Sequence, residues 1–209
     1  MSRAVVAALA GVAALAVAAT AVVRAEPDWY QRLRYPLRYE AIVTGHARNY
    51  DLEPAMLAAV IYTESRFEAD ARSAAGAIGL MQLLPETAQG IALRTGGRRF
   101  VVSDLYVPEL NVRYGSWYLR HLLDRYGDVR LALAAYHAGQ GNVDRWREQG
   151  LGVQFPETRA YVDKVLRVRE VYADAYADEL APGASGLHRA AEAATRQILA
   201  RMAAGDDPY

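Results

Sequence analysis

The sequence predicts an all-α protein built on one compact helical domain. Apolar residues recur at helical spacing in several stretches between residues 40 and 176. No stretch alternates apolar and polar residues with a period of two, so a sheet of any size is not expected. Strands, if present, are a small hairpin near Arg98–Val102. The 209 residues are enough for one domain with a real core and a short extension.

The chain begins with an apolar segment, Ala4–Val23, which carries no charge. Its length reaches the roughly 20 residues that a helix needs to cross a bilayer, and it exceeds the apolar core of about 7–15 residues in most secretory signals. Small residues nonetheless occupy the two positions at Val23–Ala25 that a signal peptidase reads. Residues 1–25 are therefore a cleaved signal peptide or a retained membrane anchor, with length favouring the anchor. Either interpretation places the rest of the chain outside the cytoplasm.

The arginines after this segment favour the opposite orientation, because positive residues near a membrane segment are usually retained in the cytoplasm. The positive residues after the segment outnumber those before it, and they are Arg24, Arg32, Arg34 and Arg38. We give the function inferred below more weight than this asymmetry.

The first half of the domain follows a polar connector at residues 26–39. A short helix is predicted for Glu40–Tyr50, and Pro54 suits the first turn of a second helix that runs to Phe67. Ala69–Leu83 is rich in Gly and small residues and has no helical stripe, which is typical of tight backbone close to a ligand. A third helix begins at Pro85 and ends before residue 97.

The second half of the domain, which ends at residue 176, holds three more predicted helices. Asn111–Tyr126 has one apolar face and ends at Gly127, and Val129–Ala138 is short and apolar. A long helix begins at Pro156, and its apolar stripe is Tyr161, Val165, Val168 and Tyr172. Residues 177–209 form an Ala-rich tail with one helix over about 188–202.

Composition excludes several classes of function. Acidic and basic residues balance at 24 each, and no basic stretch alternates with aromatic residues, so nucleic acid is not an expected partner. The chain has no cysteine, which excludes disulfides and thiolate metal sites. Its four histidines are scattered without a close helical pair, so neither a metal nor another cofactor is expected.

Glu64 is the first candidate for chemistry. Leu57, Val60, Ile61 and Glu64 occupy positions i, i+3, i+4 and i+7 of one helical face. The apolar members of that face must point into a core, and burial disfavours the charged form of a carboxyl group. The pKa of Glu64 should therefore rise until the group can donate a proton near neutral pH. The alternative is that the helix carries Glu64 to the solvated rim.

Three separated blocks of sequence together closely resemble one known catalytic domain. They are Glu64–Phe67 with Ser73 and Gly76–Gln82, then Ala135–Val143, then Pro156–Val162. In this order and spacing they resemble the soluble lytic transglycosylase (SLT) domain, and the resemblance runs from about residue 35 to 171. It implies a lysozyme-like all-helical fold and an enzyme that acts on peptidoglycan in the cell envelope, as a monomer.

The resemblance also implies a mechanism with one carboxyl group. Glu64 would protonate the glycosidic oxygen between N-acetylmuramic acid and N-acetylglucosamine. As a carboxylate it would then take the proton from the C6 hydroxyl of the same muramic acid, which attacks C1 and closes a 1,6-anhydro ring. No water is consumed.

Six further residues match substrate-binding positions of the family, and each has a structural alternative. Ser73 would orient the acetamido group, or it is a turn residue. Gly76 and Gly79 would let the backbone approach the sugar, or they are turn glycines. Gln82 would be an amide of the substrate groove, or it is a buried structural amide. Tyr136 would line the cleft within reach of Glu64, or it is an aromatic residue of the core. Glu157 would be a carboxylate near the glycan, or it is a stabilising charge at a helix N-terminus.

A departure from the usual sequence of the family and two alternative functions also have to be considered. His137 stands where the family usually has Asn, which leaves the pH profile open and gives no reason to count His137 as catalytic. A lysozyme-type hydrolase on the same fold would need a second carboxylate, for which Glu68 and Asp70 are the near candidates. A non-catalytic glycan-binding module would keep the groove and tolerate loss of Glu64.

Overall fold

The structure, a computed structural model, describes residues 26–96 and 100–180, together with residues 2, 3, 5, 9, 11–17 and 20. The chain divides into two units, Met1–Pro36 and Leu37–Tyr209. The described part of the first unit contains α2 (Asp28–Arg34), a short helix within the stretch predicted as a connector. None of the described helices is long and apolar enough to span a bilayer. Much of Ala4–Val23 lies outside the described residues, as does the tail after Leu180.

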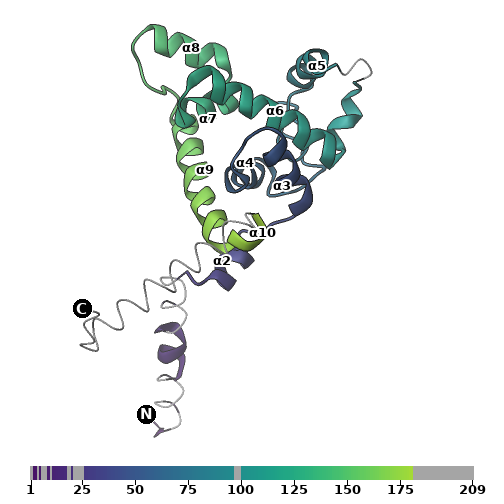
Figure 1. The fold of residues 1–209 in the computed structure, drawn as a ribbon. Coiled ribbons are helices and arrows are strands. Elements are labelled where there is room, and N and C mark those ends of the chain that lie inside the picture. Colours follow the sequence, from purple (N-terminus) through teal and green to yellow (C-terminus); the bar gives the residue numbers. More distant parts are fainter. Residues whose placement is uncertain are drawn as a thin grey trace, which may run out of the picture. The chain divides into compact units, whose positions relative to one another are not determined.

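The regular elements described in the second unit are helices, as predicted, joined by loops (Figure 1). Its elements are α3 (Glu40–Asn49), α4 (Pro54–Ser65), α5 (Pro85–Arg94), the 3-10 helix η1 (Val102–Tyr106), α6 (Pro108–Tyr126), α7 (Val129–Ala138), α8 (Gln140–Glu148), α9 (Pro156–Ala175) and α10 (Ala177–Leu180). Val102 thus begins a 3-10 helix where a hairpin was considered, and residues 97–99 lie outside the described part. The β-bridges of the described residues join Ile78 to Arg72 and to Leu83.

Helix α4 is the centre of this unit, and α3, α6 and α9 surround it (Figure 1). Pro54 stands in its first turn, and Leu57, Val60 and Ile61 are fully buried. The burial extends around the whole helix, as expected for a helix that is apolar on every side. The helix ends because Arg66 and Phe67 adopt left-handed backbone, which returns the Phe67 ring to the core against Tyr172.

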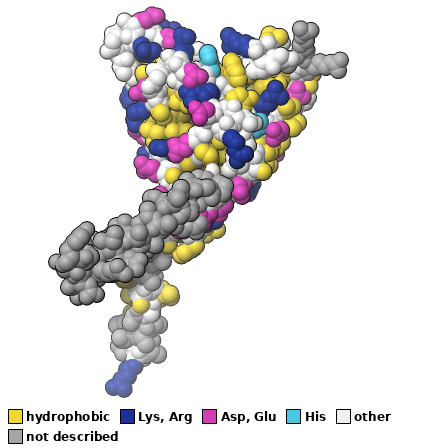
Figure 2. Space-filling model, viewed as in Figure 1, with side chains coloured by type: hydrophobic (Ala, Val, Ile, Leu, Met, Phe, Trp, Pro, Cys, Tyr) yellow, Lys and Arg dark blue, Asp and Glu magenta, His cyan; other side chains and the backbone are white. Residues whose placement is uncertain are grey.

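Helices α8 and α9 complete the region beyond α7. Helix α8, which the sequence did not predict, follows Gly139 directly and buries only Val143 and Trp146. Helix α9 packs along α4, and its predicted stripe is buried. Charged side chains of both signs are interspersed over the face in Figure 2, in keeping with the net charge of zero.

Candidate active site

Glu64 lies in the last turn of α4, at the end of the buried stripe. Burial raises the pKa of its carboxyl group from 4.5 to about 7. Two contacts oppose this rise: a hydrogen bond from the Tyr161 hydroxyl, and the positive charge of Lys164 one turn further along α9. Glu64 is partly buried, and this geometry supports the interpretation of a desolvated acid rather than of a solvated rim residue.

Tyr161 is the residue that the sequence analysis missed. Its hydroxyl donates to Glu64 Oε1 at 2.7 Å, although the sequence pattern indicated only a core position on α9. The ring is buried, which explains why periodicity placed it with its valine neighbours. A signal was present, because Tyr161 is the one member of that stripe within the Pro156–Val162 block and it brings a hydroxyl group into the core.

The loop after α4 is held beside Glu64 by one residue from each of three helices. Ser65 of α4 donates to the Leu80 carbonyl at 2.7 Å. Tyr136 of α7 donates to the Met81 carbonyl at 2.8 Å, so its hydroxyl contacts the loop rather than Glu64. Asn111 of α6 accepts the Met81 amide at 2.7 Å and donates to the carbonyls of Ile78 and Leu105 at 2.8 and 2.9 Å.

Gly79 and Gln82 brace this loop from inside. Gly79 has a φ of 81°, and a Cβ there would overlap the Asn111 amide and the Leu105 carbonyl, so its missing side chain makes room for α6 rather than for a ligand. The Gln82 amide nitrogen donates to the carbonyls of Ala71 and Gly79 at 3.0 and 2.9 Å. Gln82 also has left-handed backbone, with a φ of 46°, which is strained for a residue with a side chain.

The other predicted residues are more open. The Ser73 oxygen accepts the Ala77 amide at 3.0 Å in a turn that includes Gly76, whose φ is 84°. Ser73 is exposed, and a Cβ on Gly76 would meet nothing within 4 Å. Glu157 is exposed in the first turn of α9. Ser73 and Gly76 thus have the access that a ligand requires, which Gly79 lacks.

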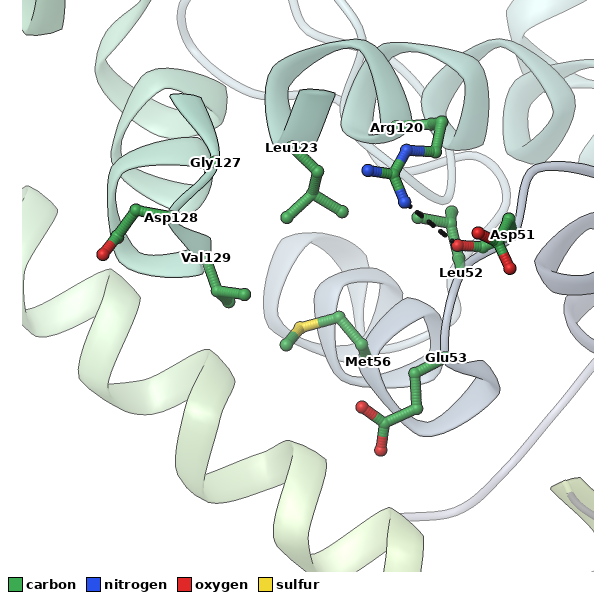
Figure 3. A pocket seen from close by; sticks show the side chains of 9 residues that line it. All are labelled: Asp51, Leu52, Glu53, Met56, Arg120, Leu123, Gly127, Asp128 and Val129. Atoms are coloured by element: carbon green, nitrogen blue, oxygen red, sulfur yellow. Dashed lines mark hydrogen bonds between the residues drawn. The ribbon is translucent and has the colours of Figure 1, made fainter. Parts of the chain in front are cut away.

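A separate cavity of about 360 Å³ lies at the other end of α4 (Figure 3). It has apolar lining from Leu52, Met56, Leu123 and Val129, and Arg120 donates beside it to the Asp51 carbonyl at 3.1 Å. Met56 and Glu64 are eight positions apart, or about 12 Å along a helix. The cavity is therefore not part of the Glu64 site.

The raised pKa of Glu64 makes stability depend on pH in a defined direction. The native state keeps the proton up to about pH 7, whereas the unfolded chain releases it near 4.5. In that interval the unfolded chain binds fewer protons, so the free energy of unfolding falls as pH rises. The full shift corresponds to about 3 kcal/mol. We expect wild type, compared with Glu64→Gln, to lose stability of this order between pH 4.5 and 7.5 in urea unfolding; parallel curves would contradict the burial argument.

Comparison with known proteins identifies the family of this chain. The family model for the transglycosylase SLT domain matches residues 42–154. The soluble lytic murein transglycosylase of Salmonella typhimurium is 32% identical over 156 residues, which cover 66% of this chain and 23% of that protein. A transglycosylase of Enterobacteria phage PRD1 is 35% identical over 131 residues, covering 63% of this chain and 43% of the phage protein.

Solved structures show the same fold. The lytic transglycosylase Slt of Pseudomonas aeruginosa, in an inactive mutant form, matches with a TM-score of 0.63 and 33% identity over 73% of this chain and 26% of that one. The 70 kDa soluble lytic transglycosylase of Escherichia coli matches with a TM-score of 0.64 and 28% identity, over 69% and 25%. The chain spans less than half of the length of these relatives. The predicted all-α, lysozyme-like fold is confirmed, and the chain belongs to the transglycosylase SLT domain family.

Proposed function

We propose that this protein is a peptidoglycan lytic transglycosylase that cleaves the β-1,4 bond from N-acetylmuramic acid to N-acetylglucosamine and leaves 1,6-anhydro ends. The observation that carries the proposal is the Glu64 carboxyl group, whose pKa of about 7 lets it both donate and accept a proton near neutral pH. The names of the relatives, which are lytic murein transglycosylases, support the substrate class.

Glu64 performs both proton transfers in the proposed reaction. Its neutral carboxyl protonates the glycosidic oxygen as the bond from C1 breaks, and positive charge develops on the muramic acid ring. The resulting carboxylate removes the proton from the C6 hydroxyl, whose oxygen bonds to C1. The carboxyl group is then neutral again. The Tyr161 hydroxyl and Lys164 stabilise the carboxylate in between.

The proposed contacts to the glycan come from residues around Glu64. Ser73 has the exposure to reach an acetamido group, and its hydroxyl proton is not used by the Ala77 amide. Gly76 permits close approach of the backbone, and Glu157 faces solvent. Gln82, Gly79 and Tyr136 act through the loop that they hold, on the contacts described above.

The hydrolase alternative lacks support from the candidates for a second carboxylate. Glu68 is exposed and bonds to Arg38 at 3.1 Å, and Asp70 is exposed. A solvated carboxylate in an ion pair is poorly placed to activate a water across a sugar ring. The binding-module alternative does not account for Glu64, because a partly buried acid with a raised pKa lowers stability at neutral pH and a purely binding surface has no use for it.

Mass analysis of digested sacculi tests the function. We expect muropeptide ends lighter by one water molecule than those left by a hydrolase. Hydrolysed ends from wild type would establish the lysozyme-type reaction instead, and absence of any cleavage by the full chain would favour the binding module.

Tyr161→Phe removes the hydroxyl that donates a hydrogen bond to Glu64, and it keeps the ring that fills the core. The pKa of Glu64 should rise further, because that hydrogen bond lowers it. We expect kcat to fall about tenfold to a hundredfold and the basic limb of the pH profile to move to higher pH. The measurement is the rate of sacculus solubilisation against pH, with the exposed Tyr106→Phe as the control. An unmoved basic limb would show that Tyr161 does not act on Glu64.

The proposed location is the cell envelope outside the cytoplasm, with peptidoglycan strands as the partner and the protein acting as a monomer. Some relatives are named as membrane-bound lytic murein transglycosylases. We propose that Ala4–Val23 anchors the chain and confines cleavage to wall near the membrane. Mass analysis of the native N-terminus decides this, since a mature chain that starts at Glu26 would refute the anchor.

A further inference from the structure

His137, at the end of α7, is clamped to two successive turns of α9. Its Nδ1 lies 3.0 Å from Thr158 Oγ1, and its ring lies 4.5 Å from the Tyr161 ring, centroid to centroid, at 30°. Thr158 is fully buried, so His137 gives its hydroxyl a partner that solvent cannot replace. The rest of the imidazole is exposed. One solvent-accessible ring is therefore tied to a buried hydroxyl and to a buried aromatic ring.

The ring that His137 covers is the one that contacts the acid. Tyr161 donates to Glu64 Oε1 at 2.7 Å, so the position of its hydroxyl decides the alignment of that bond. A misplacement of about 1 Å in such a group can reduce a rate by about a hundredfold. His137 packs on one face of Tyr161 and is itself fixed one turn earlier by Thr158. It therefore restricts the Tyr161 ring from a different helix.

We propose that His137 is a positioning residue: its neutral imidazole aligns Tyr161 with Glu64, and its protonation suppresses the reaction at acid pH. The inference rests on the proposed function. A proton on the imidazole places a positive charge over the ring bonded to Glu64. That charge favours the Glu64 carboxylate over the neutral acid that must act first. The proton also occupies a nitrogen lone pair, so a Thr158 hydroxyl that donates to Nδ1 would lose its acceptor.

The surroundings keep His137 neutral at pH 7. Burial of the clamped part of the ring lowers its pKa from 6.5, and the carboxylate of Glu157, in the first turn of α9, partly offsets this. The other groups that face the ring from α9 are Thr158 and Tyr161, and both are neutral at this pH. The group from α4 that lies beyond Tyr161 is Glu64. Protonation of His137 thus requires a pH lower than the one at which Glu64 takes up its proton.

A mechanism with one carboxyl group has no acid limb of its own. Glu64 is protonated at every pH below about 7, so Glu64 alone gives a rate that rises as pH falls and then stays level. A decline at lower pH needs a second titrating group. His137 is the imidazole in contact with the Tyr161–Glu64 pair.

Two substitutions separate the roles of the imidazole. His137→Asn keeps a polar atom for Thr158 but removes the ring and the titration, and His137→Phe keeps the ring on Tyr161 but removes the hydrogen bond and the titration. We expect both to lose the acid limb, so that their rate relative to wild type rises about threefold or more as the pH falls from 7 to below the midpoint of the His137 titration. At pH 7 we expect His137→Asn to lower kcat about tenfold, with KM little changed. The matched control, His121→Asn, removes a ring that stacks on Trp117 of α6 and should keep the wild-type profile.

A second measurement does not depend on activity. In NMR titrations of the folded full chain, the Tyr161 ring signals should shift with the midpoint of the His137 imidazole, and this shift should vanish in His137→Asn. An unchanged acid limb in both variants, or Tyr161 signals that ignore the His137 titration, would overturn the proposal. If wild type does not cleave sacculi at all, the proposed function fails, while the titration still decides whether His137 and Tyr161 are coupled.

Discussion

Replacing Glu64 with Gln should reduce turnover of peptidoglycan to near the detection limit. General acid or base catalysis contributes about a hundredfold to ten-thousandfold in rate, and here one group has both tasks, so we expect a loss at the upper end of that range. Gln has nearly the shape of Glu and can still accept the hydrogen bond from the Tyr161 hydroxyl. It can neither donate a proton to the glycosidic oxygen nor remove one from the C6 hydroxyl. Binding of glycan chains should stay within about threefold, because the reacting proton contributes little to ground-state affinity.

The matched control is Glu170→Gln, the same change at an exposed position of α9. It should leave both turnover and binding unchanged. Rates are measured by release of soluble muropeptides, and binding by sedimentation of the protein with sacculi. If Glu64→Gln cleaved at the wild-type rate, a different residue would be the acid and the proposed mechanism would be wrong.

Replacing Asn111 with Ala should cause the largest loss of stability among single changes near the site. Its side chain makes three hydrogen bonds in a fully enclosed position and joins α6 to the carbonyl of Ile78 and the amide of Met81. Truncation removes the side-chain partner of the Met81 amide and of the Leu105 carbonyl, at about 1–3 kcal/mol for each group that water cannot reach, whereas the Ile78 carbonyl still accepts the Leu83 amide. We expect a loss of about 3–5 kcal/mol in the free energy of unfolding.

Urea denaturation measures this loss as a lower midpoint with an unchanged m-value. Asn49→Ala, at the exposed end of α3, serves as the matched control and should change stability by less than about 0.5 kcal/mol. At urea concentrations where the variant is folded, the rate should still be below that of wild type, because the loop beside Glu64 is less firmly held. A stability loss under about 1 kcal/mol would mean that water or a rearranged loop replaces the Asn111 bonds.

The partial burial of the Glu64 carboxyl group could be predicted from the sequence, because it follows from the periodicity of α4. The apolar stripe that ends at Glu64 belongs to one helix, so a local pattern was sufficient. The Tyr161 contact joins α9 to α4 across about a hundred positions of sequence, and no local pattern specifies which buried tyrosine meets which acid. For the same reason, the hydroxyl of Tyr136 reaches the Met81 carbonyl rather than Glu64.

The helices that the sequence analysis missed are those with little apolar surface. Helix α8 follows Gly139, contains Gly141 in its first turn and buries only Val143 and Trp146, so its stripe is too sparse to detect. Helix α2 buries none of its residues. The role of Gly79 depends on Asn111 and Leu105, which approach it from distant sequence, so its positive φ alone could not separate a packing glycine from a ligand-binding one.

The central claim is that Glu64 alone transfers the protons and that the C6 hydroxyl of the muramic acid attacks C1. The source of the oxygen atoms in the product tests this claim most directly. Sacculi are digested by wild type in water labelled with heavy oxygen, and the new muramic acid ends are weighed. Our account predicts ends that carry no label, since the attacking oxygen is the C6 hydroxyl of the substrate. One labelled oxygen in every new end would contradict it, because a water molecule would then have been the nucleophile.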